Sequence, residues 1–453
     1  MTIRSAYVAV SLTLVWAAFM LAPGRAEARQ DHDDAHHQFT WIDGDERLEV
    51  DIRGDVVFTE DDAGVARISP GGYIKIEERR QGVRRTLDVR PGAGGTLRYT
   101  YHVDGRERSF HNESREFAAA LFLRIIRNTG VGAEQRVARI LRQDGVDGVF
   151  AEVEHIESSS AARRYLTALL EQGRLNTAQL QRMARVVVQQ VASSGMRARF
   201  LQQAAAYYLA DARTYAAYFD AVNTIPSPGD HARVLTHVLE EHPPDRAALV
   251  RLLQSARKIE SSGVKSRVLI AAAPRYDNIA DVRDAFFDAV NTIPSPGDHA
   301  RALSALLENA ALDQASVTAL FQSAKAIESS GVKARLLSVA APHFVNEAGQ
   351  RTAFFDAVGT IPSPGDHALV LQALLQEDLD KASLRALLAS ARQIESSGVK
   401  ARVLVEAAPL VASDDDLVAA YLEAADTIPS PGDHSRALSA LINQEGAGAR
   451  LTK

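Results

Sequence analysis

The chain has 453 residues, of which 46% are hydrophobic and 24% charged, and its formal net charge is −6. It is long enough for several domains and ordinary for a folded protein, and its interspersed charges argue against the basic face or tail of a nucleic-acid-binding protein. There is no cysteine, which excludes disulfides and a lipidated N-terminal cysteine, so packing must supply the stability.

Residues 1–28 resemble a signal peptide. Arg4 precedes an uncharged run over 6–22, Pro23-Gly24 breaks that run, and Ala26-Glu27-Ala28 offers small residues where signal peptidase reads them. We expect cleavage after Ala28 and a periplasmic or secreted protein. The alternative is an uncleaved anchor, and only then would the chain contact a membrane.

Residues 29–40 are polar and predict a disordered linker rich in histidine and aspartate. Their imidazole and carboxylate groups could bind Zn²⁺, Cu²⁺ or Ni²⁺, but a disordered segment fixes no coordination geometry. We therefore expect no metal site and no cofactor. The residues concerned are Asp31, His32, Asp33, Asp34, His36 and His37.

From about Trp41 to residue 111 the hydrophobic residues alternate with polar ones, as in Leu48, Val50 and Ile52. Turn sequences such as Pro70-Gly71-Gly72 separate the alternating runs. This pattern predicts an antiparallel β-meander of six or seven short strands with one face on the following helices. Residues 112–155 then show helical spacing, which predicts two bridging helices that end at Gly130 and near Gly145.

Two short sequences alternate through the rest of the chain. The first, TIPSPGDH, begins at Thr224, Thr292, Thr360 and Thr427, and the second, IESSGVK, begins at Ile259, Ile327 and Ile394. Each contains an isoleucine or valine that recurs every 33 to 35 residues. This marker falls at Ile156, Val191, Ile225, Ile259, Ile293, Ile327, Ile361, Ile394 and Ile428.

Each unit predicts a helical hairpin. In the unit of Ile225, Ser227 or Asp230 can cap the first helix, Pro243-Pro244 breaks the chain, and a second apolar stripe follows. One hairpin cannot bury both of its stripes, so neighbouring units must stack. We predict an α+β protein, mainly α, in which a HEAT-like α-solenoid of about nine 34-residue repeats over 156–453 follows the small β-domain. The Trp/Leu-Gly/Tyr signature of tetratricopeptide repeats is missing.

The motifs that suggest catalysis have simpler interpretations. Ser262 and Lys265 fit S-x-x-K, a nucleophile motif of serine β-lactamases, but the motif recurs in equivalent units and its companion motifs are absent, which favours a helix cap. A histidine follows Gly-Asp in four units, at His231, His299, His367 and His434. Copies two units apart cannot share one metal ion, so we predict structural or surface histidines, which could still tune partner binding with pH. We predict no catalytic residue.

Aromatic residues also recur, as Tyr218-Phe219, Phe286-Phe287, Phe354-Phe355 and Tyr421. Adjacent helical residues point about 100° apart, so one of each pair could lie on a ridge and anchor a partner. The alternative is that both pack between units. Tyr218, Phe286, Phe354 and Tyr421, with the four histidines, are therefore our candidate partner-binding residues.

Part of the chain resembles the extracytoplasmic C-terminal region of bacterial membrane metallopeptidases of the β-lactam-sensor type and its stand-alone relatives. The resemblance lies in residues 54–59 (GDVVFT), 68–78 (ISPGGYIKIEE) and 136–141 (RVARIL), followed by the repeats. The zinc motif and the membrane helices of those peptidases are missing, so proteolysis is not implied. What the resemblance implies is an envelope location with a sensing or docking role.

These observations favour a non-enzymatic, exported interaction scaffold that binds a protein partner in the cell envelope and no nucleic acid. The alternative is a ligand-sensing module in which the β-domain binds a small molecule and the solenoid relays the event. That alternative needs a pocket near Tyr99, Tyr101 and Phe117. An enzyme with an unrecognised site is the third hypothesis.

Overall fold

The computed structural model describes residues 36–344 and 346–444, so the predicted signal peptide and residues 29–35 lie outside the described residues. The chain forms two compact units that divide between Leu169 and Leu170. Among the described residues no helix is both long enough and apolar enough to cross a bilayer. The linker expected over 29–40 is corrected at its end, because residues 36–40 belong to a β-strand in which His36 pairs with Asp51 at 2.8 Å.

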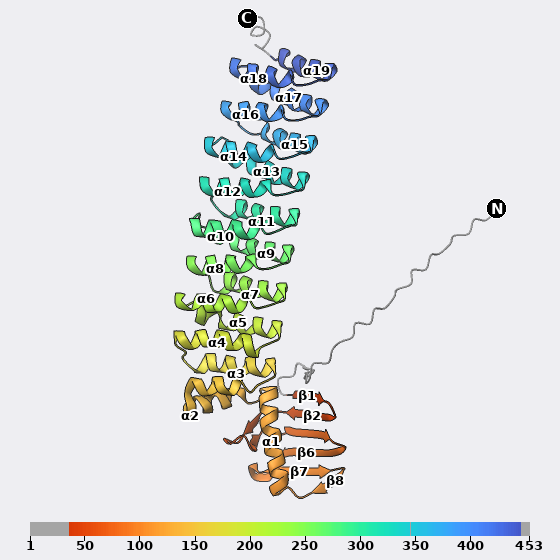
Figure 1. Cartoon of the computed structure of the whole chain (residues 1–453), viewed down its shortest axis with the longest axis vertical. Helices are drawn as coiled ribbons and strands as arrows, with labels where there is room; N and C mark the ends of the chain where they lie inside the picture. Colours follow the sequence, from red (N-terminus) through yellow and green to blue (C-terminus); the bar gives the residue numbers. More distant parts are fainter. Residues whose placement is uncertain (1–35, 345, 445–453) are drawn as a thin grey trace, which may run out of the picture. The chain divides into compact units, whose positions relative to one another are not determined.

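The first unit contains a six-stranded antiparallel sheet with the strand order β1-β2-β5-β6-β7-β8, and a separate β3-β4 hairpin. The described residues thus hold eight strands instead of the expected six or seven, because the chain leaves the main sheet after β2 to form the hairpin and returns at β5 (Figure 1). The strands are β1 (His36–Asp43), β2 (Glu46–Arg53), β3 (Val56–Phe58), β4 (Val65–Ile68), β5 (Tyr73–Arg80), β6 (Val83–Pro91), β7 (Leu97–Val103) and β8 (Arg106–Arg108), with a short 3-10 turn η1 (Ala93–Gly95) before β7.

One face of the sheet packs against helix α1 (Asn112–Thr129). Alternating side chains such as Leu48, Ile52 and Ile74 join Phe122 and Ile125 of α1 in one buried cluster. Gly130, with a φ of 69°, ends α1 as predicted. Helix α2 (Ala133–Val153) is interrupted at Gly145, whose φ of 68° is not helical. One helical segment therefore ends there, as predicted, and a second segment of eight residues follows it to Val153.

The second unit is an α-solenoid of stacked hairpins (Figure 1). Helix α3 (Ser159–Gln172) crosses the division between the two compact units. The even-numbered helices pack against one another in one layer: α4 (Thr177–Gln190), α6 (Ala212–Val222), α8 (Arg246–Arg257), α10 (Ala280–Val290), α12 (Gln314–Lys325), α14 (Ala348–Val358), α16 (Lys381–Ala391) and α18 (Asp415–Ala425). The odd-numbered helices form the other layer: α5 (Ser194–Tyr208), α7 (Pro228–Glu241), α9 (Ser262–Ala272, followed by the 3-10 turn η2, Ala273–Arg275), α11 (Pro296–Asn309), α13 (Ser330–Phe344), α15 (Pro364–Leu374), α17 (Ser397–Val411) and α19 (Pro431–Ile442).

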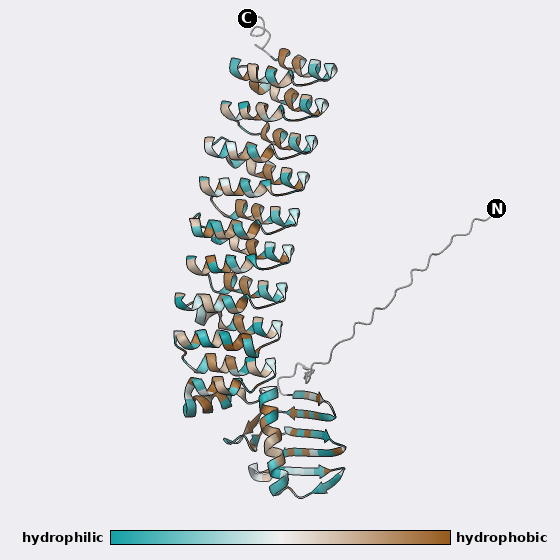
Figure 2. Ribbon diagram, in the orientation of Figure 1, coloured by the Kyte–Doolittle hydropathy of each residue, from teal (hydrophilic) through white to brown (hydrophobic). Residues whose placement is uncertain are grey.

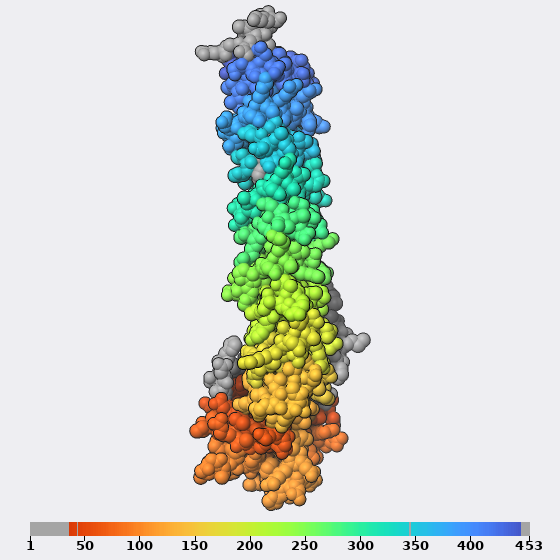
Figure 3. Space-filling model, turned by 90° about the vertical axis from the view of Figure 1, so that its left-hand side faces the viewer, coloured from red at the N-terminus to blue at the C-terminus, as the bar shows by residue number. Residues whose placement is uncertain are grey.

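The TIPSPGDH sequences begin their helices as predicted. Ser227 is the N-cap of α7 and accepts from the backbone N–H of Asp230, with Pro228 in the first helical position. The same serine cap recurs at α11, α15 and α19. Every helix presents both hydrophobic and hydrophilic residues (Figure 2), and the marker isoleucines are buried between units. Figure 3 shows the outer face of the even-numbered layer, where successive units follow one another along the solenoid.

Candidate functional site

The predicted aromatic anchors lie in the core and not on a ridge. Tyr218, Phe286, Phe354 and Tyr421 are at most 1% exposed, because each faces the interior between the two layers. The hydroxyl of Tyr218 donates to the carbonyl of Leu201 and that of Tyr421 to the carbonyl of Ala437, both at 2.9 Å. As surface anchors for a partner these four predictions are therefore wrong.

Three of the four predicted histidines are also buried. His231, His299 and His367 are 3–4% exposed, so they form no titrating line on the surface. In each, Nε2 lies 2.8 Å from a serine hydroxyl on the next helix: Ser255, Ser323 and Ser390 respectively. Desolvation by burial lowers the pKa of each histidine to about 4, and Lys258 adds to the effect on His231. They are neutral structural groups at ordinary pH.

In two units the histidine–serine pair extends to a third residue. Ser255 donates to Asn223 at 2.7 Å, and Ser323 donates to Asn291 at 2.6 Å. Each asparagine caps the C-terminal end of the preceding unit's even-numbered helix, so the chain of hydrogen bonds links neighbouring units. The position equivalent to these asparagines is Gly359 in front of the unit of Ile361.

The fourth histidine differs from the others. His434 on α19 is half-buried, with 33% of its side chain exposed, and lies 3.4 Å from Asp426. Because α19 is the last helix of the described residues, the serine-bearing helix that follows the other three histidines has no described counterpart here. The predicted role of His434 in partner binding stays a prediction.

Alternate units place a basic side chain at the same helical position as the histidines. Lys333 on α13 donates to the carbonyl of Lys325 at 3.0 Å and to the hydroxyl of Thr360 at 2.9 Å. It therefore lies between the C-terminal ends of α12 and α14, where the helix dipoles favour a cation. Lys400 makes the equivalent contacts with Arg392 and Thr427, Lys265 donates to Thr292, and Arg197 occupies the same place on α5.

This geometry explains the S-x-x-K motifs. Desolvation lowers the pKa of Lys265, Lys333 and Lys400, but each ammonium is committed to acceptors at helix C-termini. The expected serine cap is not formed: Ser261 is the N-cap of α9, and its side chain makes no capping hydrogen bond. Instead, the carboxylate of Asp298 from the next unit lies over the first turn of α9 beside Gly263.

The most regular exposed feature of the solenoid is a row of arginines that the sequence reasoning missed. It lies on the odd-numbered layer, two residues after the repeated histidine, lysine or arginine. We call it the arginine row: Arg199, Arg233, Arg267, Arg301, Arg335, Arg402 and Arg436, all exposed. Leu369 occupies the equivalent position on α15. Aligning the units by their markers, and not only by their identical turn sequences, would have revealed this row.

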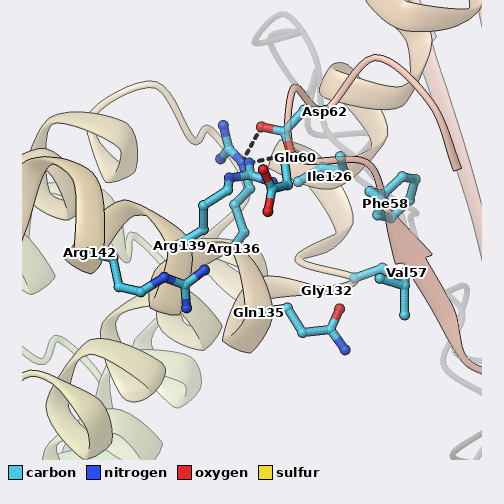
Figure 4. A pocket seen from close by; sticks show the side chains of 11 residues that line it. Val57, Phe58, Glu60, Asp62, Ile126, Gly132, Gln135, Arg136, Arg139 and Arg142 are labelled. Atoms are coloured by element: carbon cyan, nitrogen blue, oxygen red, sulfur yellow. Dashed lines mark hydrogen bonds and ion pairs between the residues drawn. The ribbon is translucent and has the colours of Figure 1, made fainter. Parts of the chain in front are cut away.

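The first unit contains a buried network of ion pairs beside a cavity of about 160 Å³ (Figure 4). Asp62, in the loop between β3 and β4, accepts from Arg136 at 2.7 Å and from Arg139 at 2.6 Å. Arg136 also pairs with Glu152, which Arg127 contacts at 2.7 Å. Desolvation opposes the charge of Arg136, but its hydrogen bonds outweigh that effect and raise its pKa.

Two arginines of this cavity are committed to acidic residues, whereas Arg142 is exposed at its rim (Figure 4). The arrangement fixes the β3-β4 hairpin against α2 and leaves little unpaired charge for a ligand. Among the described residues no group of three or more histidine, aspartate or glutamate side chains has an arrangement that could hold a metal ion.

The pocket that the ligand-sensing alternative needs corresponds to an open groove. Tyr101 and Phe117 line a groove of about 750 Å³ at the junction of the sheet and α1, and the Arg85 guanidinium lies 5.1 Å from the Phe117 ring centre. Tyr99 is not part of its lining. Its ring stacks on Phe110 at 4.6 Å, and its hydroxyl donates to the carbonyl of Val65.

Comparison with known proteins gives no relative: no family model, no curated protein and no solved structure matches the chain.

Proposed function

We propose that this protein is a non-enzymatic interaction scaffold of the bacterial cell envelope, whose solenoid binds a protein partner. The supporting observation is that one turn of the odd-numbered helices carries a buried linking residue and an exposed basic residue. The histidine or lysine points inward and joins the units, whereas the arginine two residues later is exposed in unit after unit. A stack of equivalent units that exposes the same side chain repeatedly is suited to an extended partner.

The residues that first suggested chemistry support this proposal. The histidine and lysine side chains that could act as a base make hydrogen bonds within and between units. A structural use explains why they recur, whereas an active site used once would alter a single unit. The envelope location rests on the signal-like residues 1–28 and on the resemblance to sensor-associated extracytoplasmic regions.

Affinity capture from cross-linked native envelope extract tests the proposal. The full protein is compared with a variant that lacks the units after Ile225. Enrichment of one or two envelope proteins by the full protein, lost with the deletion, is the expected result. Equal recovery of those proteins with the deleted variant would remove the solenoid from the function.

A second candidate function, small-ligand sensing by the first unit, is favoured by the groove beside Tyr101 and Phe117. An aromatic floor with Arg85 and Arg108 at its edge suits an anionic ring or sugar derivative. Thermal-shift measurement with soluble cell-wall fragments distinguishes the candidates. A concentration-dependent rise in melting temperature that Phe117→Ala abolishes would favour sensing over scaffolding.

A further inference from the structure

The arginine row offers alternating free and engaged guanidinium groups. Arg233, Arg301 and Arg436 each pair with an aspartate three residues earlier on the same helix, namely Asp230, Asp298 and Asp433. In the alternate units a valine, or in the first of them a methionine, replaces that aspartate. The arginines of those units consequently have no ion-pair partner among the described residues: Arg199, Arg267, Arg335 and Arg402.

The row has a defined spacing. Neighbouring helices in a layer pack about 8–10 Å apart, so successive arginines lie about that far apart and the free ones at about twice the distance. A polyproline II helix has three residues per turn and rises about 3.1 Å per residue, which places every third side chain on one face about 9 Å apart. An extended polypeptide with a carboxylate at every third residue therefore matches the row.

The row is not a uniform positive stripe. Asp366 also lies beside it, although Leu369 replaces the arginine that would pair with this aspartate, so the seven arginines are accompanied by four aspartates in alternate units. A continuous polyanion such as a nucleic acid would meet repulsion at alternate units, whereas a peptide can place its carboxylates selectively. The aspartates that already bind Arg233, Arg301 and Arg436 show that the row accepts carboxylates.

Apolar surface accompanies the charges. A groove of about 430 Å³ between α11 and α13 is lined by Arg301, Arg335 and Val339. Val339 on α13 is 57% exposed, and Leu369 on α15, the next helix of the same layer, is 46% exposed. The position of these two side chains between Arg335 and Arg402 gives a peptide apolar contacts that a phosphate polymer does not use.

We infer that the arginine row is the docking surface for an extended, acidic segment of a protein partner, with Asp or Glu at intervals of three residues or multiples of three. The inference rests on the proposed scaffold function and specifies the chemistry of its partner. Failure of the inference would leave the scaffold standing if envelope capture still depended on the solenoid.

The test is binding of the purified protein to synthetic peptides, measured by fluorescence anisotropy at low salt. The matched probe repeats the tripeptide Pro-Pro-Glu eight times, which pre-organises it in the polyproline II conformation so that it loses little entropy on binding. The spacing control has the same composition, but its eight glutamates form one block between two blocks of eight prolines. The matched probe is expected to bind at least about threefold more tightly than the block peptide, and both affinities should fall as salt is raised.

Charge-reversal variants locate the surface. The double variant R267E/R335E is expected to weaken binding of the matched probe about tenfold, since it removes two attractions and adds two repulsions. The control R251E/R385E reverses two exposed arginines of the even-numbered layer and should change affinity less than about twofold. L369R, which fills the gap in the row, should tighten binding.

Three results would overturn the inference: equal binding of the matched and block peptides, equal effects of the two double variants, or tighter binding of duplex DNA or of phosphatidylglycerol vesicles than of the matched probe. The last result would identify a general polyanion or membrane surface.

Discussion

The two kinds of solenoid unit bury different polar side chains at the same position. The units of Ile225, Ile293 and Ile361 bury a neutral histidine at the fourth position of the odd-numbered helix, whereas those of Ile259, Ile327 and Ile394 bury a lysine there. The histidine completes a short chain of side-chain hydrogen bonds, and the lysine stabilises carbonyls at helix C-termini. Burial is nearly equal at 3–4%, so the difference lies in which neighbouring groups need a partner.

The alternation of histidine and lysine units depends on contacts between neighbouring units. The histidines of the first two such units are linked through serine to the end of the preceding unit, and each lysine reaches beyond its own even-numbered helix to the threonine in front of the next marker. Because neighbouring units share these groups, exchanging a histidine for a lysine would leave hydrogen-bonding groups in both neighbouring units without a partner. The duplicated element is therefore the pair of units.

Loss of a lysine is the largest effect that we expect from a single substitution. Lys333→Met keeps the length of the side chain but removes the ammonium donor from the partly buried carbonyls of Lys325 and Thr360, which should lower the free energy of unfolding by about 3 kcal/mol. Urea denaturation measures the change. Lys333→Arg is the control and should cost much less, because Arg197 occupies the equivalent place on α5. An equal loss in both variants would show that volume, and not the donor, matters.

The histidines should make stability depend on pH. Their folded pKa of about 4 lies below the ordinary 6.5, so between these values the unfolded chain binds protons that the folded chain does not. The contribution of each neutral histidine to the free energy of unfolding is complete above pH 6.5 and is lost as the pH falls towards 4. The loss between pH 7.5 and 5 is on the order of 2 kcal/mol per histidine. Melting temperatures at the two pH values measure it.

The triple variant H231Q/H299Q/H367Q is the matched control for the pH dependence. Glutamine can hydrogen-bond to serine but does not titrate, so the variant should lose most of the change in melting temperature between pH 7.5 and 5. If the variant keeps the full change, the buried histidines are not its source.

A smaller effect, in the stabilising direction, is expected at Gly359. Its φ of −59° is helical and needs no glycine, and asparagine there would recreate the third member of the hydrogen-bonded chain with Ser390. Gly359→Asn should raise the free energy of unfolding by about 1 kcal/mol, part from the lower entropy of the unfolded chain and part from the hydrogen bond. Gly359→Ala supplies only the first part and should gain less. A destabilised Asn variant would mean that Gln393, 3.1 Å from the new Cβ, cannot move aside.

The smallest stability effect belongs to the exposed arginines. Arg335→Glu should change the free energy of unfolding by less than about 0.5 kcal/mol, since the side chain is exposed and has no ion pair among the described residues. Thermal denaturation checks this. A loss comparable with that of Lys333→Met would give the arginine row a structural role and weaken the case for docking.

The sequence predicted the architecture better than the direction of individual side chains. Repeated turn residues place the ends of units without ambiguity, so the hairpins and the cap at Ser227 were predicted correctly. The sequence left open whether Phe286 and His299 lie in the core or on the surface, because spacing along one helix does not tell which side faces the second layer. The Asp62–Arg136 pair joins residues 74 positions apart, and no local sequence pattern predicts such a contact.

Photo-cross-linking in the native envelope tests whether the solenoid binds a partner through its odd-numbered layer. A benzophenone amino acid is placed at Val339, beside the arginine row, or at Gln322, an exposed residue of the even-numbered layer. We expect a discrete protein adduct from position 339, lost in the R267E/R335E background, and none from position 322. An adduct from position 322 alone would place the partner on the opposite face and contradict docking on the odd-numbered layer.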